Sequence, residues 1–176
     1  GHKVGVLGMG GLGHMGVKFA KALGAEVTIF TRSEAKVAEA KKQGADHVII
    51  STDKEQMKAA ADSFDFLLDT IPVAHDLNPY LKCLKYDGTH ILVGLLTPIE
   101  PALQAGLLVT KRRVVAGSLI GGMPETQEVL DFCAEHDITC DIEMLDIRNI
   151  NEAYVRMKKG DVKYRFVIDM KTLKEG

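Results

Sequence analysis

The chain has 176 residues, 46% of them apolar, and its 22 basic and 24 acidic residues leave a formal net charge of −2, which fits one globular domain or one domain with an appended segment. Because the charge is balanced and no long basic run occurs, nucleic acid and anionic membranes are not indicated as partners. No apolar stretch reaches the roughly 18 residues of a membrane span, and no secretory signal is evident, so we expect a cytoplasmic protein.

Short apolar, β-branched runs alternate with longer stretches of helical period, the pattern of a parallel sheet with helices on both faces. Strands are predicted at residues 3–7, 26–31, 46–50, 64–70, 89–94 and 114–119. Helices are predicted at residues 12–23, 34–43, 54–61, 75–85 and 101–109. Because parallel crossovers are right-handed, we expect a doubly wound α/β sheet of six strands, the Rossmann fold, in the order 3-2-1-4-5-6. The reversal of winding at strand 1 predicts a ligand crevice.

The pattern changes after residue 121. "GGMPETQEVLDFCAEH" predicts a Gly turn and an amphipathic helix, which are followed by a helix near residues 149–159 and a strand at "YRFVID". We therefore divide the chain into an α/β domain of residues 1–121 and a C-terminal segment of residues 122–176.

Gly8, Gly10 and Gly13 form the pattern GxGxxG directly after the first predicted strand and at the start of the first predicted helix. In dinucleotide-binding units these glycines provide a tight turn, close approach to a pyrophosphate and close packing of helix on strand. The alternative is a tight turn in an α/β protein that binds no dinucleotide. His14, which follows the last glycine, is expected to lie at the surface or helix start and not to be catalytic.

The second predicted strand ends in Thr31, where NAD-binding units carry an acid that binds the ribose 2′-hydroxyl. An acid would repel the 2′-phosphate of NADP, whereas Thr31, Arg32, Ser33 and Lys36 offer hydroxyl donors and two cations. This stretch therefore predicts a 2′-phosphate pocket and NADP(H) as the cofactor. The alternative is a solvated helix start whose charges are incidental.

Metal-ligand spacing is not found in this sequence. Cys83, Cys133 and Cys140 are too few and too far apart for a CxxC zinc site, and their odd number disfavours a disulfide framework, so buried free thiols are predicted. The remaining histidines also lack ligand spacing and are expected to be structural or solvated: His2, His47, His75, His90 and His136.

Several longer segments resemble one family. "GMGGLGHMGVKFAKALGAEV", "TRSEAK", "VAGSLIGGMPETQEVLDFCAEHDI" and "INEAYVRMKKGDVKYRFVID" resemble the zinc-dependent medium-chain alcohol dehydrogenases of the cinnamyl alcohol dehydrogenase type, over essentially the whole chain. The resemblance implies an NADP-dependent oxidoreductase that interconverts primary alcohols and aldehydes by hydride transfer. In this family a catalytic zinc acts as a Lewis acid on the substrate oxygen.

The resemblance also implies which positions contact the cofactor. The pyrophosphate loop would be Gly8, Gly10, Gly11, Leu12 and Gly13, and the adenosine phosphate pocket Thr31, Arg32, Ser33 and Lys36. The ribose and nicotinamide would be lined by residues after strands 4, 5 and 6, namely Thr70, Ile71, Val93, Gly94, Leu95, Ser118, Leu119 and Ile120. The alternative for this last group is ordinary buried core.

The family's zinc ligands and proton relay lie in a domain that precedes this stretch, so the chain as given is expected to bind cofactor without catalysing the reaction, with no catalytic or metal-binding residues of its own. Its start at Gly1-His2 suggests an excised or processed piece. Family dimers pair across the sheet edge that corresponds to residues 114–120, so a homodimer is expected.

Two other functions use a similar fold. A free-standing NAD(P)-binding regulatory or sensor module would lack hydride chemistry, but it has no reason to carry the dehydrogenase-like segment after Gly122. A methyltransferase would favour an acid where Thr31 stands. The resemblance therefore favours the cofactor half of a dehydrogenase.

Overall fold

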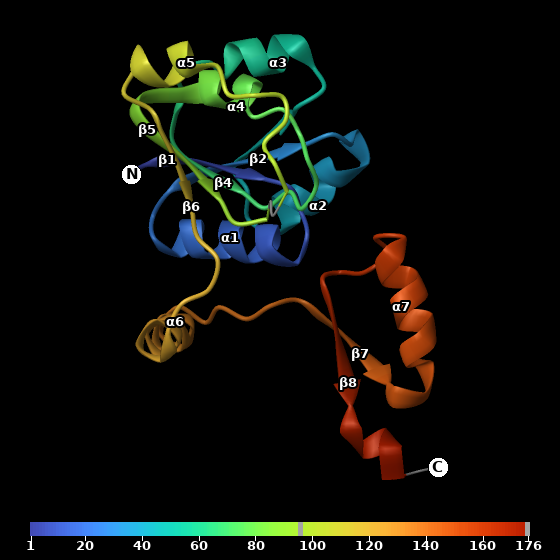
Figure 1. Cartoon of the computed structure of the whole chain (residues 1–176). Helices are drawn as coiled ribbons and strands as arrows, with labels where there is room; N and C mark the ends of the chain where they lie inside the picture. The colour runs from blue at the N-terminus through green and yellow to red at the C-terminus, as the bar shows by residue number, and fades with distance from the viewer. Residues whose placement is uncertain (95–96, 175–176) are drawn as a thin grey trace.

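The computed structural model describes residues 1–94 and 97–174. Its main sheet has six strands, all parallel, in the order β3-β2-β1-β4-β5-β6 (Figure 1). This confirms the predicted doubly wound sheet. The strands are β1 (Lys3–Leu7), β2 (Glu26–Thr31), β3 (His47–Ile50), β4 (Phe64–Asp69), β5 (Leu84–Leu92) and β6 (Val114–Gly117).

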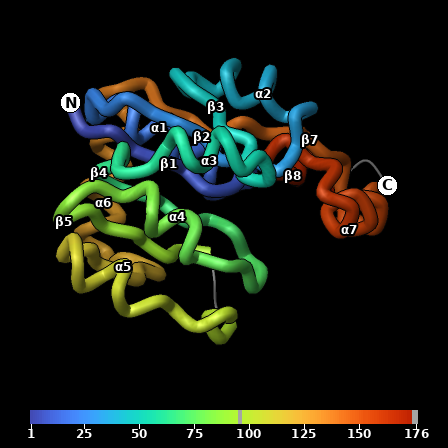
Figure 2. Tube along the Cα trace, turned by 90° about the horizontal axis from the view of Figure 1, so that it is seen from above, coloured from blue at the N-terminus to red at the C-terminus, as the bar shows by residue number. Residues whose placement is uncertain are grey.

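Helices cover both faces of the sheet, and consecutive strand residues supply the two cores beneath them (Figures 1 and 2). Val6 and Ile29 belong to one buried cluster, while their neighbours Leu7 and Phe30 belong to the other, because side chains alternate along a strand. None of the helices in the described part of the chain is long and apolar enough to cross a membrane. The helices of this domain are α1 (Gly11–Ala22), α2 (Val37–Lys42), α3 (Lys54–Ala59), α4 (Asn78–Cys83) and α5 (Ala105–Val109), and a 3₁₀ turn, η1 (Glu34–Lys36), precedes α2.

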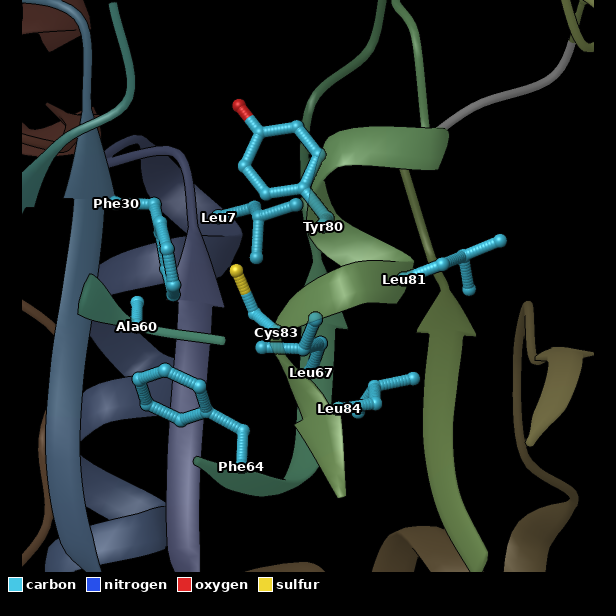
Figure 3. Packing of buried hydrophobic residues seen from close by; sticks show 9 residues of the cluster. All are labelled: Leu7, Phe30, Ala60, Phe64, Leu67, Tyr80, Leu81, Cys83 and Leu84. Atoms are coloured by element: carbon cyan, nitrogen blue, oxygen red, sulfur yellow. The ribbon is translucent and has the colours of Figure 1, made fainter. Parts of the chain in front are cut away.

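The core on the α3 to α5 side is built around aromatic rings (Figure 3). Phe30 meets Phe64 and Tyr80 edge to face, with ring centroids 5.3 and 5.6 Å apart. Cys83 is fully buried beside them, and burial raises the pKa of its thiol to about 11. All three cysteines are free, as predicted, although only Cys83 is fully buried and Cys133 and Cys140 are half-buried.

Among the predicted boundaries that differ from the structure are the starts of α4, α5 and β5. Helix α4 begins at Asn78 rather than near residue 75, because the Asp76 carboxylate accepts the Asn78 N–H at 2.9 Å and Pro79 occupies the first turn. Helix α5 begins at Ala105 rather than near residue 101. Strand β5 begins at Leu84 rather than at residue 89, and a shift in register between Phe64 and Phe66 interrupts its pairing with β4.

The C-terminal segment leaves the sheet after β6, and its last two strands with the helix between them form a separate small unit (Figure 1). Its two strands are parallel, with Ile142 opposite Arg165 and Asp146 opposite Asp169. Strand β7 was not predicted, because a five-residue strand whose partner lies more than 20 positions away carries a weak local signal. The elements are α6 (Met123–Glu135), β7 (Ile142–Asp146), η2 (Ile147–Asn149), α7 (Ile150–Lys158), β8 (Arg165–Asp169) and η3 (Met170–Lys174).

Candidate functional site

A cleft of about 690 Å³ lies at the carboxyl ends of β1, β2 and β4, where open parallel sheets bind ligands. Its lining joins three stretches that are distant in sequence: the glycine loop after β1, the residues after β2, and the loop after β4. Tyr80 and Arg165 complete the wall. Of the predicted contact residues, the cleft brings together Gly8, Gly10, Gly11, Leu12, Thr31, Arg32, Ser33, Lys36, Thr70 and Ile71.

The glycine loop has the geometry that close approach to a phosphate requires. Gly8 has φ +89°, a conformation that favours glycine. A Cβ on Gly13 would lie 2.2 Å from the Gly8 carbonyl oxygen, whereas a Cβ on Gly10 would meet nothing within 4 Å. Gly13 thus packs beneath the loop, and Gly10 faces open space in the cleft.

Helix α1 presents its amino end to the same space. Its N-cap is Gly10, no side chain caps it, and no acid lies in its first turn. The first N–H groups and the positive end of the helix dipole are therefore available to an anion.

The stretch after β2 places cations at the cleft mouth. Thr31 is buried, and its Oγ1 accepts the Ser33 N–H at 3.2 Å, while Arg32 and Lys36 are exposed. Ser33 occupies the N-cap position of η1, but its hydroxyl makes no capping bond. Its hydroxyl is therefore available to a ligand.

The end of β4 and the loop after it border the third side of the cleft. They contain a buried hydrogen-bond network that was not predicted from the sequence. Asp69, at the end of β4, is fully buried, and its Oδ2 accepts from His75 Nε2 at 2.8 Å and from His90 Nε2 at 2.9 Å. Its Oδ1 accepts the Ile71 N–H at 3.0 Å. Burial alone would raise the pKa of Asp69, but these hydrogen bonds lower it to about 2. The carboxylate thereby fixes the loop that borders the cleft.

His75 is held in its charged form. Its Nε2 faces Asp69, and its Nδ1 lies 2.8 Å from the Val73 carbonyl oxygen. Both partners are acceptors, so the ring donates from both nitrogens, which only the imidazolium does. The hydrogen bond to Asp69 raises the pKa of His75 against the opposing effect of burial. The expectation that His75 and His90 are structural agrees with these contacts, although His75 also lines the cleft.

We expect His75→Gln to lower the free energy of unfolding by about 1.5–3 kcal/mol at pH 6, because a charged hydrogen bond is lost. Since the pKa of folded His75 is raised, its contribution is complete below about pH 6.5 and disappears as the pH rises through the folded-state pKa. Urea unfolding of both proteins at pH 6 and pH 9 should show the difference shrinking. An equal difference in the free energy of unfolding at pH 6 and pH 9 would contradict a charged His75. The control is His47→Gln, a change at an exposed histidine.

Not every predicted contact residue lines the cleft. Gly94 packs behind Thr70, where its Cβ position would lie 2.5 Å from the Thr70 carbonyl carbon, and the Val93 N–H donates to the Asp69 carbonyl at 2.9 Å. The Thr70 hydroxyl is itself occupied, since it donates to the Leu7 carbonyl at 2.7 Å. Leu95 lies outside the described residues.

The residues after β6 also lie apart from the cleft lining. Ser118 donates its N–H to the Leu92 carbonyl at 3.0 Å, and Leu119 and Ile120 are 71% and 87% exposed. The core alternative is therefore wrong for Leu119 and Ile120, whose role in binding stays a prediction.

Arg165 was also missed. It lies on β8 in the C-terminal segment, yet it lines the cleft, and its Nη2 donates to the Gly11 carbonyl at 3.4 Å. A basic residue 154 positions from the loop carries no local signal. Its guanidinium adds positive charge beside the open amino end of α1.

Within residues 1–94 and 97–174, no group of three or more His, Cys, Asp or Glu side chains is arranged to hold a metal ion. His75 and His90 each hydrogen-bond the Asp69 carboxylate through Nε2 and do not form a set of three ligands around a common point. The described residues therefore do not fit a zinc site.

Comparison with known proteins identifies similar chains. A family model described as "Zinc-binding dehydrogenase" matches residues 11–135. The chain is 56% identical over 173 residues to the aldehyde reductase YahK of Escherichia coli K12, covering 98% of this chain and 50% of that protein. It is 49% identical over 171 residues to a probable cinnamyl alcohol dehydrogenase of Pinus radiata, covering 97% and 48% respectively. The chain thus spans about half the length of the curated relatives it matches.

Solved structures that resemble this chain also include cinnamyl alcohol dehydrogenases. A cinnamyl alcohol dehydrogenase of Sorghum bicolor matches with a TM-score of 0.90 and 44% identity, covering 96% of this chain and 48% of that one. A cinnamyl alcohol dehydrogenase of Helicobacter pylori complexed with NADP(H) matches with a TM-score of 0.83 and 43% identity, covering 97% and 48%.

Proposed function

The chain belongs to the zinc-binding dehydrogenase family, and on this premise we propose that its cleft binds NADP(H) as the cofactor half of an enzyme that interconverts primary alcohols and aldehydes. The observation that carries the proposal is the meeting of an open glycine loop with Arg32, Ser33 and Lys36 in one cleft. The relatives named for aldehyde reduction, cinnamyl alcohol oxidation and NADP(H) binding support it.

The described residues fit a dinucleotide. Gly10 leaves room for a pyrophosphate, and the uncapped amino end of α1 supplies N–H groups to it. Arg32 and Lys36 would hold the 2′-phosphate, with the Ser33 hydroxyl as a further donor. The loop fixed by Asp69 would form the wall toward the nicotinamide. When bound, NADPH supplies a hydride, and this chain's residues bind and orient it.

The domain assignment and the expected inactivity remain proposals. We propose that residues 1–121 form the cofactor domain, that residues 122–176 complete its cleft through Arg165, and that the 176-residue chain binds cofactor without turnover. Parallel titration with NADPH and NADH, followed by emission of the reduced nicotinamide because the chain has no Trp, tests the binding. NADPH is expected to bind more tightly than NADH. If neither cofactor binds, the proposed cofactor-binding function is refuted.

We expect Arg165→Ala to weaken NADPH and NADH by the same factor, about tenfold, because the Gly11 end of the cleft would contact phosphates that both cofactors share. The same titrations measure it, with Lys171→Ala, an exposed change in η3, as the control. A loss confined to NADPH would place Arg165 at the 2′-phosphate instead.

The predicted homodimer also belongs to this proposal. Strand β6 is an edge strand that pairs only with β5 among the described strands, and Val114 is 48% exposed. An exposed edge offers N–H and C=O groups to a second copy. Sedimentation velocity should give a dimer mass for the chain, and a monomer across the micromolar range would contradict the proposal.

A further inference from the structure

His14 lies at the start of α1, one of its two expected places, but it is fully buried and not at the surface. It lies in the first turn of α1, and its ring sits between the glycine loop and the C-terminal segment. Its partners in the C-terminal segment are Asp141 and Tyr164, which both follow α6, and Asp141 lies 127 positions from His14 in the sequence.

Three contacts surround the His14 ring, and two of them indicate which ring nitrogen carries the proton. Its Nδ1 lies 3.2 Å from the Gly10 carbonyl oxygen, and its Nε2 lies 3.3 Å from the Asp141 amide nitrogen. The Tyr164 ring stacks on it, with centroids 4.4 Å apart. A carbonyl only accepts and an amide N–H only donates, so the proton is on Nδ1 and Nε2 carries the lone pair. His14 is therefore neutral.

The charges around His14 agree with this state. Burial lowers the pKa of His14, and Lys18 and Arg165 lower it further, against the raising effects of the Gly10 carbonyl and Asp141. Asp141 is itself engaged, by Lys18 Nζ at 2.6 Å and by Gln43 Nε2 at 2.7 Å.

The stacked tyrosine is fixed from the other side. The Tyr164 hydroxyl donates to Glu39 Oε1 at 3.0 Å, and Lys163 pairs with the same carboxylate at 3.2 Å. Arg165, which reaches Gly11, is the next residue in the chain. The residue that stacks on His14 is therefore directly followed in the chain by the residue that enters the cleft.

We infer that His14 is a positioning residue that joins the phosphate-binding loop to the C-terminal segment through its Nδ1–H tautomer, and so holds Arg165 over the amino end of α1. This inference rests on the proposed function. Protonation of Nε2 would turn it into a second donor that faces the Asp141 N–H. The contact between the phosphate-binding loop and the C-terminal segment should therefore loosen as the pH falls.

The first test reads the tautomer without cofactor. ¹⁵N NMR of the imidazole rings should show His14 protonated on Nδ1, with a titration midpoint below the usual value for a histidine and with the Tyr164 amide shifting along with it. An Nε2–H tautomer, or a Tyr164 signal that ignores the titration, would overturn the inference. Because no cofactor is present, this result is independent of whether the cleft binds NADPH.

The second test is a double-mutant cycle of His14→Asn with Arg165→Ala, read by NADPH affinity. Asparagine keeps an N–H donor near the Nδ1 position and loses the ring stack and the Nε2 acceptor. Arg165→Ala should weaken binding about tenfold in the wild-type background but less than about twofold beside His14→Asn. Additive losses would refute the coupling.

Matched variants keep this test decisive. His47→Asn is the control and should leave the effect of Arg165→Ala unchanged. If circular dichroism shows His14→Asn to be unfolded, Tyr164→Leu takes its place in the cycle, because it removes the stack and leaves the His14 side chain in position. A wild-type chain that binds no NADPH would refute the proposed function, while the NMR titration would still decide whether His14 forms the junction.

Discussion

Replacement of Arg32 by alanine is expected to weaken NADPH binding by about ten- to a hundredfold while leaving NADH binding within about twofold. Arg32 is exposed at the cleft mouth, directly after β2, and it forms no ion pair with another described residue. Its guanidinium is free to bind a phosphate on both oxygens, a geometry that a lysine cannot reproduce. NADH lacks the 2′-phosphate and has nothing to lose at this position.

Parallel titrations of wild type and Arg32→Ala with both cofactors measure this selectivity. The matched control is Lys42→Ala, which removes an exposed cation at the end of α2 and should change neither affinity. Equal losses for NADPH and NADH would show that Arg32 acts through the general field of the cleft and not through the 2′-phosphate. The incidental-charge alternative predicts no change at all.

Gly10→Ala is expected to separate binding from stability. Because a Cβ at this position meets no atom within 4 Å, the free energy of unfolding should stay within about 0.5 kcal/mol of wild type. The same methyl group would occupy the space that the pyrophosphate needs, so both cofactors should bind about ten- to a hundredfold more weakly. Urea unfolding and cofactor titration on one preparation measure the two effects.

Two other glycines serve as references for this result. Gly13→Ala places a Cβ 2.2 Å from the Gly8 carbonyl oxygen, so it should destabilise the fold by about 1–3 kcal/mol or more as well as abolish binding. Gly106→Ala, in the exposed helix α5, meets nothing within 4 Å and should stabilise slightly without affecting binding. Unchanged NADPH affinity in Gly10→Ala would mean that the glycine loop is only a turn.

The sequence predicted the main sheet well because the signals involved are local. The continuous apolar runs of β1 and β2 reflect strands that are buried on both faces, and Val6 with Leu7 shows this directly, since each contributes to a different core. The glycine spacing also marks its own turn, because the constraint on Gly13 comes from Gly8 only five positions away.

The boundaries of the elements depended on side-chain contacts that the apolar periodicity of the sequence does not reveal. Helix α4 was predicted to start near residue 75, but His75 turns inward to Asp69, and the Asp76 carboxylate accepts the Asn78 N–H where the helix begins. These side-chain bonds offer the backbone an alternative to helix, which propensity alone does not register.

By itself, then, the sequence determined the strands of the sheet, the glycine loop and the cationic stretch after β2, because each is specified by residues within about 20 positions of one another. The order of the strands followed from the right-handedness of parallel crossovers. Only the tertiary structure decided that Arg165 completes the cleft and that His14 is buried, since their partners lie 154 and 127 positions away. It likewise decided the charge of His75, because the protonation of an imidazole depends on which acceptors and donors the fold brings to its two nitrogens.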